Sequence, residues 1–213
     1  MTDATTSDPT IPNHHAHHPG FSGLSGYVAA WSFRFGRADE ASLAADLVAL
    51  APGDRLVDIG CGSGAAARLA AERGASVTGV DPARVMLDVA RATSRRRLGI
   101  AWATGTAEDL PLPDGGVEVA WSLATVHHWA DLAGGLAEVR RVLAPGGRFL
   151  AMERQVPPDA DGLASHGWTP AQAARFAEDC RAVGLLADDV AVHETRRGTQ
   201  LCVLARRPAD GPG

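Results

Sequence analysis

Short apolar runs alternate with longer amphipathic segments through the middle of the chain. The runs have the length of buried strands and cover residues 55–59, 76–80, 100–103, 117–123 and 148–152. The segments between them carry apolar residues at helical spacing over residues 65–73, 82–93 and 132–143. Strands joined by single helices predict a parallel sheet with helices on both faces.

The C-terminal part of the chain follows a different pattern. A helix is predicted over residues 170–183, and strand-like runs follow over residues 190–195 and 200–205. Arg196-Arg197-Gly198 reads as a hairpin between these runs, so the last strand pair is predicted to be antiparallel at one sheet edge. Together the patterns predict an α/β fold with a Rossmann-like, doubly wound, mostly parallel seven-stranded sheet.

Composition narrows the class of protein. The chain has 213 residues and 46% apolar content, enough for one domain with a sizeable core. Its net charge of −5 does not favour binding to nucleic acid. No apolar run approaches the roughly 18 residues that are needed to span a bilayer. All 20 basic residues are arginine, which excludes a Walker-type phosphate loop and Schiff-base chemistry because both need lysine. Three scattered cysteines without zinc spacing favour a reducing, cytoplasmic location.

A glycine-rich loop follows the first predicted strand. Gly60-Cys61-Gly62-Ser63-Gly64 lies at the carboxyl end of that strand, where parallel sheets bind ligands, and Asp58 precedes it. The next helix directs its N-terminal amides toward the loop. The loop is ambiguous alone, because Gly60, Gly62 and Ala65 also satisfy the looser dinucleotide fingerprint.

A second acidic residue, Asp81, ends the second predicted strand about 20 residues after the loop. Its two carboxylate oxygens could accept both hydroxyl protons of a ribose. The same residue could instead cap the helix that is predicted to begin at Pro82, and both roles are compatible.

Five ordered segments over residues 50–150 resemble one family. The segments are Leu56–Gly64, Gly79–Met86, Gly105–Asp114, Ser122–Trp129 and Glu138–Arg148. They are similar to the motifs of class I S-adenosylmethionine-dependent methyltransferases, in particular the broad group that includes the ubiquinone and menaquinone biosynthesis enzymes. The resemblance implies the class I methyltransferase fold, S-adenosylmethionine as cofactor and S-adenosylhomocysteine as product.

The resemblance also implies roles for particular residues. Asp58 would organise the loop near the methionine end of the cofactor, the loop backbone would face the cofactor, and Asp81 would hold the ribose. The implied cofactor-binding residues are Asp58, Gly60, Cys61, Gly62, Asp81, Pro82, Met86, Thr106, Ala107, Glu108, Ser122 and Leu123. Thr106 departs from the family pattern, which has Asp or Asn to accept from the adenine amino group. Threonine can still accept a hydrogen bond, and Glu108 could substitute.

Two groups of histidines invite a chemical interpretation. His127 and His128 would lie at the cleft mouth, where either could act as general base, with His128 favoured by position. Alternatively, one caps the next helix and the other packs under Trp129. The N-terminal cluster of His14, His15, His17 and His18 could bind a metal, but adjacent histidines in a tail are common, and no metal site is predicted.

Three parts of the chain are predicted. Residues 1–20 form a flexible tail, residues 21–50 an N-terminal helical lid region, and residues 51–207 the methyltransferase domain. A lid is what the resemblance implies for the aromatic residues Tyr27, Trp31 and Phe33, although ordinary core packing explains them equally well.

The predicted function is transfer of a methyl group to an O, N or C nucleophile of a small-molecule acceptor, without nucleic-acid or membrane partners. The oligomeric state is not predicted. An NAD(P)-dependent oxidoreductase would need a catalytic Tyr or Lys, whereas the chain has no lysine and only Tyr27. A cofactor-binding protein without transferase activity is a third alternative, which the intact Asp58 and Asp81 disfavour.

Overall fold

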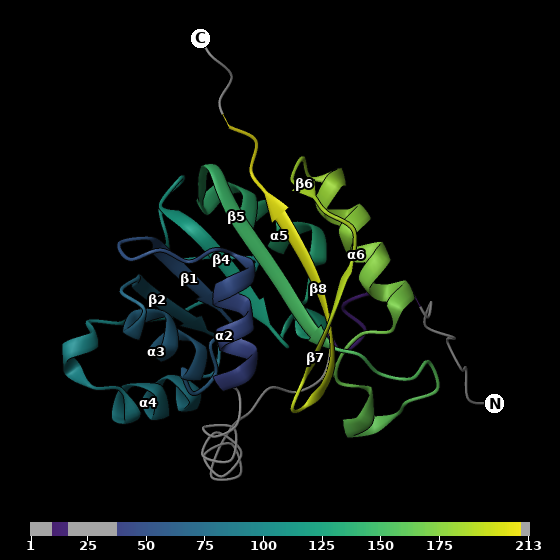
Figure 1. The fold of residues 1–213 in the computed structure, drawn as a ribbon, viewed down its shortest axis with the longest axis horizontal. Coiled ribbons are helices and arrows are strands. Elements are labelled where there is room, and N and C mark those ends of the chain that lie inside the picture. The colour runs from purple at the N-terminus through teal and green to yellow at the C-terminus, as the bar shows by residue number, and fades with distance from the viewer. Residues whose placement is uncertain (1–9, 17–37, 210–213) are drawn as a thin grey trace.

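The computed structural model describes residues 10–16 and 38–209, drawn in colour in Figure 1. The helices and strands, with 3-10 helices labelled η, are α2 (Ala38–Leu47), β1 (Arg55–Ile59), α3 (Ala65–Glu72), β2 (Ser76–Asp81), α4 (Arg84–Thr93), η1 (Arg96–Leu98), β3 (Ala101–Thr104), β4 (Val117–Leu123), η2 (Val126–His128), α5 (Leu132–Val142), β5 (Leu143–Arg154), η3 (Gly162–Ser165), α6 (Pro170–Ala182), β6 (Leu186–Ala187), β7 (Ala191–Thr195) and β8 (Gly198–Arg206).

One sheet carries all the described strands, in the order β3-β2-β1-β4-β5-β8-β6, with β7 also paired to β8. The first five strands are parallel, and β8 runs antiparallel to β5, β6 and β7. Because β6 and β7 pair with β8 at different residues, the eight strands fill seven positions. The predicted α/β fold, with its mostly parallel sheet and antiparallel C-terminal pair, is confirmed.

Alternate residues of the central strands enter two apolar cores, one on each face of the sheet. In β1, Leu56 packs on the side of α2 and α3, whereas Val57 packs on the side of α5 and α6. In β5, Leu150 packs in the core with Leu56, and Phe149 packs in the core with Val57. Figure 1 shows the helices arranged in layers about the strands. A sheet buried on both faces explains why its strands appear in the sequence as nearly continuous apolar runs.

Two element boundaries differ from the sequence-based expectation. The strand predicted over residues 148–152 is longer in the structure, where β5 includes Gly146, which has a φ of +77° and donates its amide to the carbonyl of Arg207. Helix α4 begins at Arg84 and not at Pro82. The strand was predicted too short because hydrogen bonds with Arg207, near the C-terminal end of the described residues, continue it through Gly146 and Gly147.

Residues 10–16 (purple in Figure 1) are fixed to the body of the protein by hydrogen bonds. The indole nitrogen of Trp168 donates to the carbonyl of Pro12 at 2.9 Å, and the backbone amide of His15 donates to the carbonyl of His127 at 2.8 Å. Gln172 donates to the carbonyl of Ile11 at 3.0 Å. These residues therefore differ from the loose tail predicted for them. The rest of the tail, and the lid region through residue 37, lie outside the described residues.

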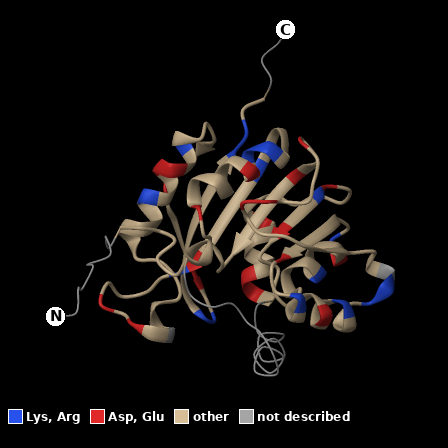
Figure 2. Ribbon diagram, turned by 180° about the vertical axis from the view of Figure 1, so that it is seen from behind, with Lys and Arg blue, Asp and Glu red and all other residues tan. Residues whose placement is uncertain are grey.

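Charged residues of both signs are interspersed along the helices and loops, as Figure 2 shows. Most described ion pairs are exposed, as between Arg91 and Asp88, and such pairs contribute little to stability. Within the described ranges, no helix combines the length and apolar content that crossing a membrane requires.

Candidate cofactor site and histidine cluster

The predicted site residues converge on the carboxyl ends of β1, β2 and β4. Asp58 is the last residue but one of β1, and Asp81 is the last residue of β2. Ser122 and Leu123 are the last two residues of β4. Asp58 pairs in register with Gly79 on one side and with Trp121 on the other, in the middle of the sheet. Strand order reverses between β1 and β4, which is the position where open α/β sheets bind their ligands.

The glycine loop is held in one conformation by its own backbone and by β2. Gly60, Gly62 and Gly64 all have left-handed φ angles, of +71°, +52° and +79°. The amides of Gly60 and Cys61 both donate to the carbonyl of Val80, at 2.8 and 3.0 Å. Residues with a side chain pay a steric cost for this conformation, so the repeated glycines are explained by the backbone alone.

Thr125 connects the ends of β1 and β4 under the loop. Its hydroxyl lies 2.6 Å from that of Ser122 and donates to the carbonyl of Ile59 at 3.2 Å. A Cβ on Gly60 would come within 2.8 Å of three Thr125 side-chain atoms. Sequence reasoning gave no role to Thr125, because its importance arises from contact with a residue 66 positions away.

The carboxyl group of Asp81 is buried and binds two backbone amides. Oδ2 accepts from the amide of Gly62 and Oδ1 from the amide of Ala83, both at 2.8 Å. Burial raises the pKa of Asp81 above its ordinary value, and these two hydrogen bonds oppose the shift. Asp81 therefore anchors the glycine loop and the turn before α4, but it is not the helix cap considered for it, because the N-cap position is Ala83 and no side chain caps α4.

The loop and β2 are closed on one side by the ring of Trp102 on β3. A Cβ on Gly79 would lie 2.5 Å from that ring, and a Cβ on Gly64 would lie 2.3 Å from it. The thiol of Cys61 is buried beside the same residues, and burial followed by the charges of Asp58 and Asp81 raises its pKa. A thiol that stays protonated is a poor nucleophile, so Cys61 contributes backbone and volume to the site.

Two neighbouring residues of the segment after β3 differ in exposure. Thr106 is exposed and Ala107 is buried beside the packed pair of Trp129 and Gly135. Glu108 accepts the amide of Asp131 at 3.1 Å, at the start of α5. Glu108 is therefore already engaged with α5, which weakens its candidacy as a substitute for the missing Asp or Asn.

The two remaining predicted residues of the adenosine side differ in exposure. Met86 is buried in α4, in a small apolar cluster with Val85 and Val89. Pro82 is exposed in the turn before α4. The structure thus places Pro82 beside Asp81 at the surface, whereas Met86 contributes to the packing of its helix.

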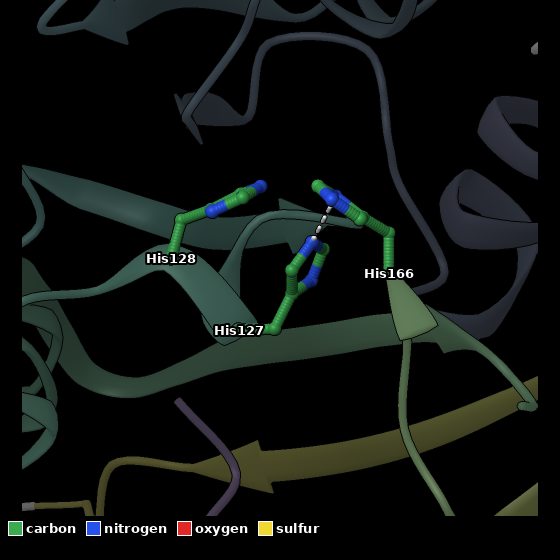
Figure 3. Close-up of side chains that lie close together, drawn as sticks. All are labelled: His127, His128 and His166. Carbon is green, nitrogen blue, oxygen red and sulfur yellow. Dashed lines mark hydrogen bonds between the residues drawn. The ribbon is translucent and has the colours of Figure 1, made fainter. Parts of the chain in front are cut away.

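Three histidine rings converge next to this site, at the ends of β4 and β5 (Figure 3). His127 and His128 belong to η2, and His166 follows η3. The Nδ1 atom of His127 donates to Oε2 of Glu153 at 2.9 Å, and its Nε2 atom lies 3.4 Å from Nδ1 of His166. His127 and Glu153 are both fully or almost fully buried, so this pair is held in a fixed orientation.

His128 differs from His127 in its surroundings. It is the most exposed of the three, and no carboxyl group of the described residues pairs with it. Its pKa is lowered to about 3, first by desolvation of the ring and then by the like charges that His127 and His166 would carry. A hydrogen bond to the backbone of His15 opposes the shift. At neutral pH His128 is therefore an uncharged imidazole.

The N-terminal histidines His14 and His15 lie against the same cluster. The ring of His15 stacks on that of His166 with 4.5 Å between centroids, and its Nε2 atom lies 2.9 Å from the hydroxyl of Ser165. His17 and His18 lie outside the described residues. Sequence reasoning missed Glu153 and His166, since neither belongs to a motif and they reach His127 from 26 and 39 residues away.

Comparison with known proteins identifies similar sequences and folds. Residues 57–151 match the family described as "Methyltransferase domain". Over 99 residues, 46% of this chain, the sequence is 42% identical to malonyl-[acyl-carrier protein] O-methyltransferase of Serratia marcescens, covering 38% of that protein. It is 34% identical to demethylmenaquinone methyltransferase of Tropheryma whipplei, over 54% of this chain and 47% of the relative. The chain thus matches half or less of the length of these curated relatives.

Solved structures share the fold over a larger part of the chain. A SAM-dependent methyltransferase from Aquifex aeolicus superposes with a TM-score of 0.70 and 17% sequence identity, covering 85% of this chain and 98% of that one. At this level of identity the similarity concerns the fold.

Proposed function

We propose that this chain binds S-adenosylmethionine and transfers its methyl group to a small-molecule acceptor, because residues 57–151 match the methyltransferase-domain family. The observation that carries the proposal is the geometry of Asp81 and the glycine loop at the switch point of the sheet. When bound, the cofactor supplies an electrophilic methyl group on a sulfonium cation.

The carboxyl group of Asp81 fits a ribose. A carboxylate has about four acceptor sites on its two oxygens, and the amides of Gly62 and Ala83 occupy one on each. One site on each oxygen is left for the two adjacent hydroxyls of the sugar. The two amides also fix the direction of the carboxyl group, so little ordering is needed on binding.

The open space beside Gly62 fits the close approach of a ligand. A Cβ on Gly62 would meet no atom of the described residues within 4 Å, although the backbone there is tightly held. We assign the ligand-facing backbone to Gly60, Cys61 and Gly62, with the buried Asp58 behind them. The adenine would lie along the segment of Thr106 and Ala107, with the amide of Ala107 as donor and Pro82 at its edge.

The acceptor side of the site would lie at the ends of β4 and β5, beyond Ser122 and Leu123. Positioning and exclusion of water supply much of the catalysis in a direct displacement. An efficient general base has a pKa near the working pH, so His128, with a pKa of about 3, is a weak candidate. The ring of His127 is fixed by Glu153, but its Nε2 atom faces His166, so His127 is also a weak candidate. The name of the Tropheryma whipplei relative gives a small organic acceptor, demethylmenaquinone, which supports a small-molecule acceptor here.

Calorimetry with S-adenosylmethionine and with NADH tests the cofactor. We expect binding of the sulfonium cofactor and of S-adenosylhomocysteine, and none of NADH. Incubation of the protein with cell extract and a labelled methyl donor then tests transfer to an acceptor. Binding of NADH alone would refute the proposal. Cofactor binding without label transfer to any extract component would favour a binding protein without transferase activity.

A further inference from the structure

The histidine cluster formed by His127, His128 and His166 has the composition of a metal site. One ring nitrogen of each residue can be chosen so that all three lie within 4.8 Å of one another. Figure 3 shows the three rings directed toward a common space. Histidine is the commonest protein ligand of transition metals, and neutral imidazole suits zinc, copper, iron and nickel.

The spacing of the two best-placed nitrogens agrees with coordination. Nε2 of His127 and Nδ1 of His166 are 3.4 Å apart. Two histidine nitrogens bound to one tetrahedral zinc ion, each about 2.0–2.1 Å from it, lie about 3.3 Å apart. A ring nitrogen of His128 completes the set, in which all three ligand atoms lie within 4.8 Å of one another.

We propose that His127, His128 and His166 bind a divalent transition-metal ion of the zinc type at the carboxyl ends of β4 and β5. This site goes beyond the proposed methyl transfer and does not depend on it. It also replaces the sequence-based expectation of no metal site, which had considered only the histidines of the N-terminal segment.

The surroundings of His127 support this proposal independently of the spacing. Metal-binding histidines usually donate their second ring nitrogen to a carboxylate or a backbone carbonyl, which fixes the tautomer. His127 donates Nδ1 to the fully buried Glu153, so its Nε2 atom carries the lone pair toward the cluster. Glu153 thus holds the ring ready for a ligand on the other side.

The number of ligands indicates the kind of site. Structural zinc sites are closed by four protein ligands, whereas catalytic sites have three and keep one position open. The described residues supply three nitrogens here, and the nearby His15 stacks on His166 while its Nε2 atom contacts Ser165. The fourth position is therefore open to water or another oxygen ligand.

The competing interpretation is a chain of hydrogen bonds without metal. Nδ1 of His166 could donate to Nε2 of His127, which in turn donates to Glu153. This chain accounts for two of the rings but gives no role to the convergence of His128 on the same space.

The metal site and the metal-free chain of hydrogen bonds can be distinguished by calorimetry. The full chain is stripped of metals with a chelator and then titrated with zinc. We expect one equivalent of Zn²⁺ to bind, and Co²⁺ to give the visible absorption of a tetrahedral site. His128→Ala and His166→Ala should each weaken Zn²⁺ binding by more than about 100-fold, because they remove ligands, and Glu153→Gln by about 10–100-fold. Circular dichroism and thermal unfolding establish that each variant is folded.

Two control variants separate this site from adventitious binding. His193→Ala, on β7, and the double variant His17→Ala/His18→Ala should bind Zn²⁺ like the wild type. The proposal is overturned if the wild type binds no stoichiometric Zn²⁺, or if His128→Ala and His166→Ala bind it as tightly as the wild type. Loss of binding in the double variant would place the ion on the N-terminal segment and would also overturn it. None of these outcomes depends on methyl transfer.

Discussion

Single residues at the carboxyl ends of the strands combine structural roles with the binding roles that we propose for them. Asp81 is the clearest case, because its carboxyl group holds the loop and the turn before α4 and still has acceptor sites left. Since folding raises its pKa above 3.8, ionised Asp81 disfavours the folded state. This penalty is fully present above the folded pKa and disappears as the pH falls toward 3.8. The fold thus tolerates a cost that a binding role would explain.

We expect Asp81→Asn to weaken binding of S-adenosylmethionine by about 10–100-fold, because hydrogen bonds to charged groups contribute about 1.5–3 kcal/mol. The affinity of the wild type should also fall as the pH falls through the raised pKa of Asp81, since protonation removes an acceptor. Calorimetry at several pH values measures both effects, and circular dichroism monitors the fold. An unchanged affinity in a folded variant would leave Asp81 with its bonds to the loop and the turn as its only role.

Gly62 and Gly99 form a matched pair for testing the loop. Both have left-handed φ angles, +52° and +62°, and a Cβ on either would meet no described atom within 4 Å. Gly62→Ala and Gly99→Ala should therefore each cost about 1–2 kcal/mol of stability. Only Gly62→Ala should weaken S-adenosylmethionine binding, because its methyl group enters the proposed site. Urea unfolding and calorimetry measure the two effects, and equal affinities for both variants would contradict this placement of the cofactor.

At the scale of elements, the packing of β3 on β2 determines the shape of the loop. The ring of Trp102 lies where side chains on Gly79 and Gly64 would have to be, so small residues on one strand and a large residue on the next are complementary. Gly79 has no left-handed φ, so its role can be tested without backbone strain.

Gly79→Ala should destabilise the protein by about 1–3 kcal/mol, the usual cost of inserting a methyl group into a well-packed core. The same substitution should cost less in a Trp102→Ala background, because the clash is with the Trp102 ring. Urea unfolding of the wild type, both single variants and the double variant gives the coupling energy. Additive effects would show that the Trp102 contact is not the cause.

The central strands were predictable because burial on both faces makes them continuous apolar runs, and β1 and β4 occur at the predicted residues. Strand β6 was missed since it has only two residues, Leu186 and Ala187, too few for a pattern. The cofactor loop was also predictable, because its backbone requires glycine at fixed spacing within one short segment. The histidine cluster was not, because His166 and Glu153 meet His127 only through tertiary structure.

At the scale of the whole molecule, residues 10–16 tie the N-terminal part of the chain to α6 and η2. Trp168 is fully buried, and its indole nitrogen donates to Pro12 across 156 residues of sequence. Asn13 donates to the carbonyl of Trp129 in the same way, across 116 residues. These bonds bring His15 against the histidine cluster.

Trp168→Phe should lower the free energy of unfolding by about 1–3 kcal/mol, because it removes a buried donor. It should also increase hydrogen exchange of the amides in residues 10–16, since that segment loses its anchor. Phe176→Leu is the control, because Phe176 packs on Trp168 without bonding to the segment. Equal exchange in residues 10–16 of both variants would mean that the other contacts hold the segment.

The hydrogen bonds of residues 10–16 also affect the order in which parts of the protein can fold during synthesis. Ile11 leaves the ribosome early, but its partner Gln172 follows 161 residues later. At about 5–20 residues per second, the segment waits roughly ten to thirty seconds for the surface to which it binds. The strands from β1 to β5 are synthesised in that interval, so the histidine cluster acquires its N-terminal neighbours only after these strands have been made.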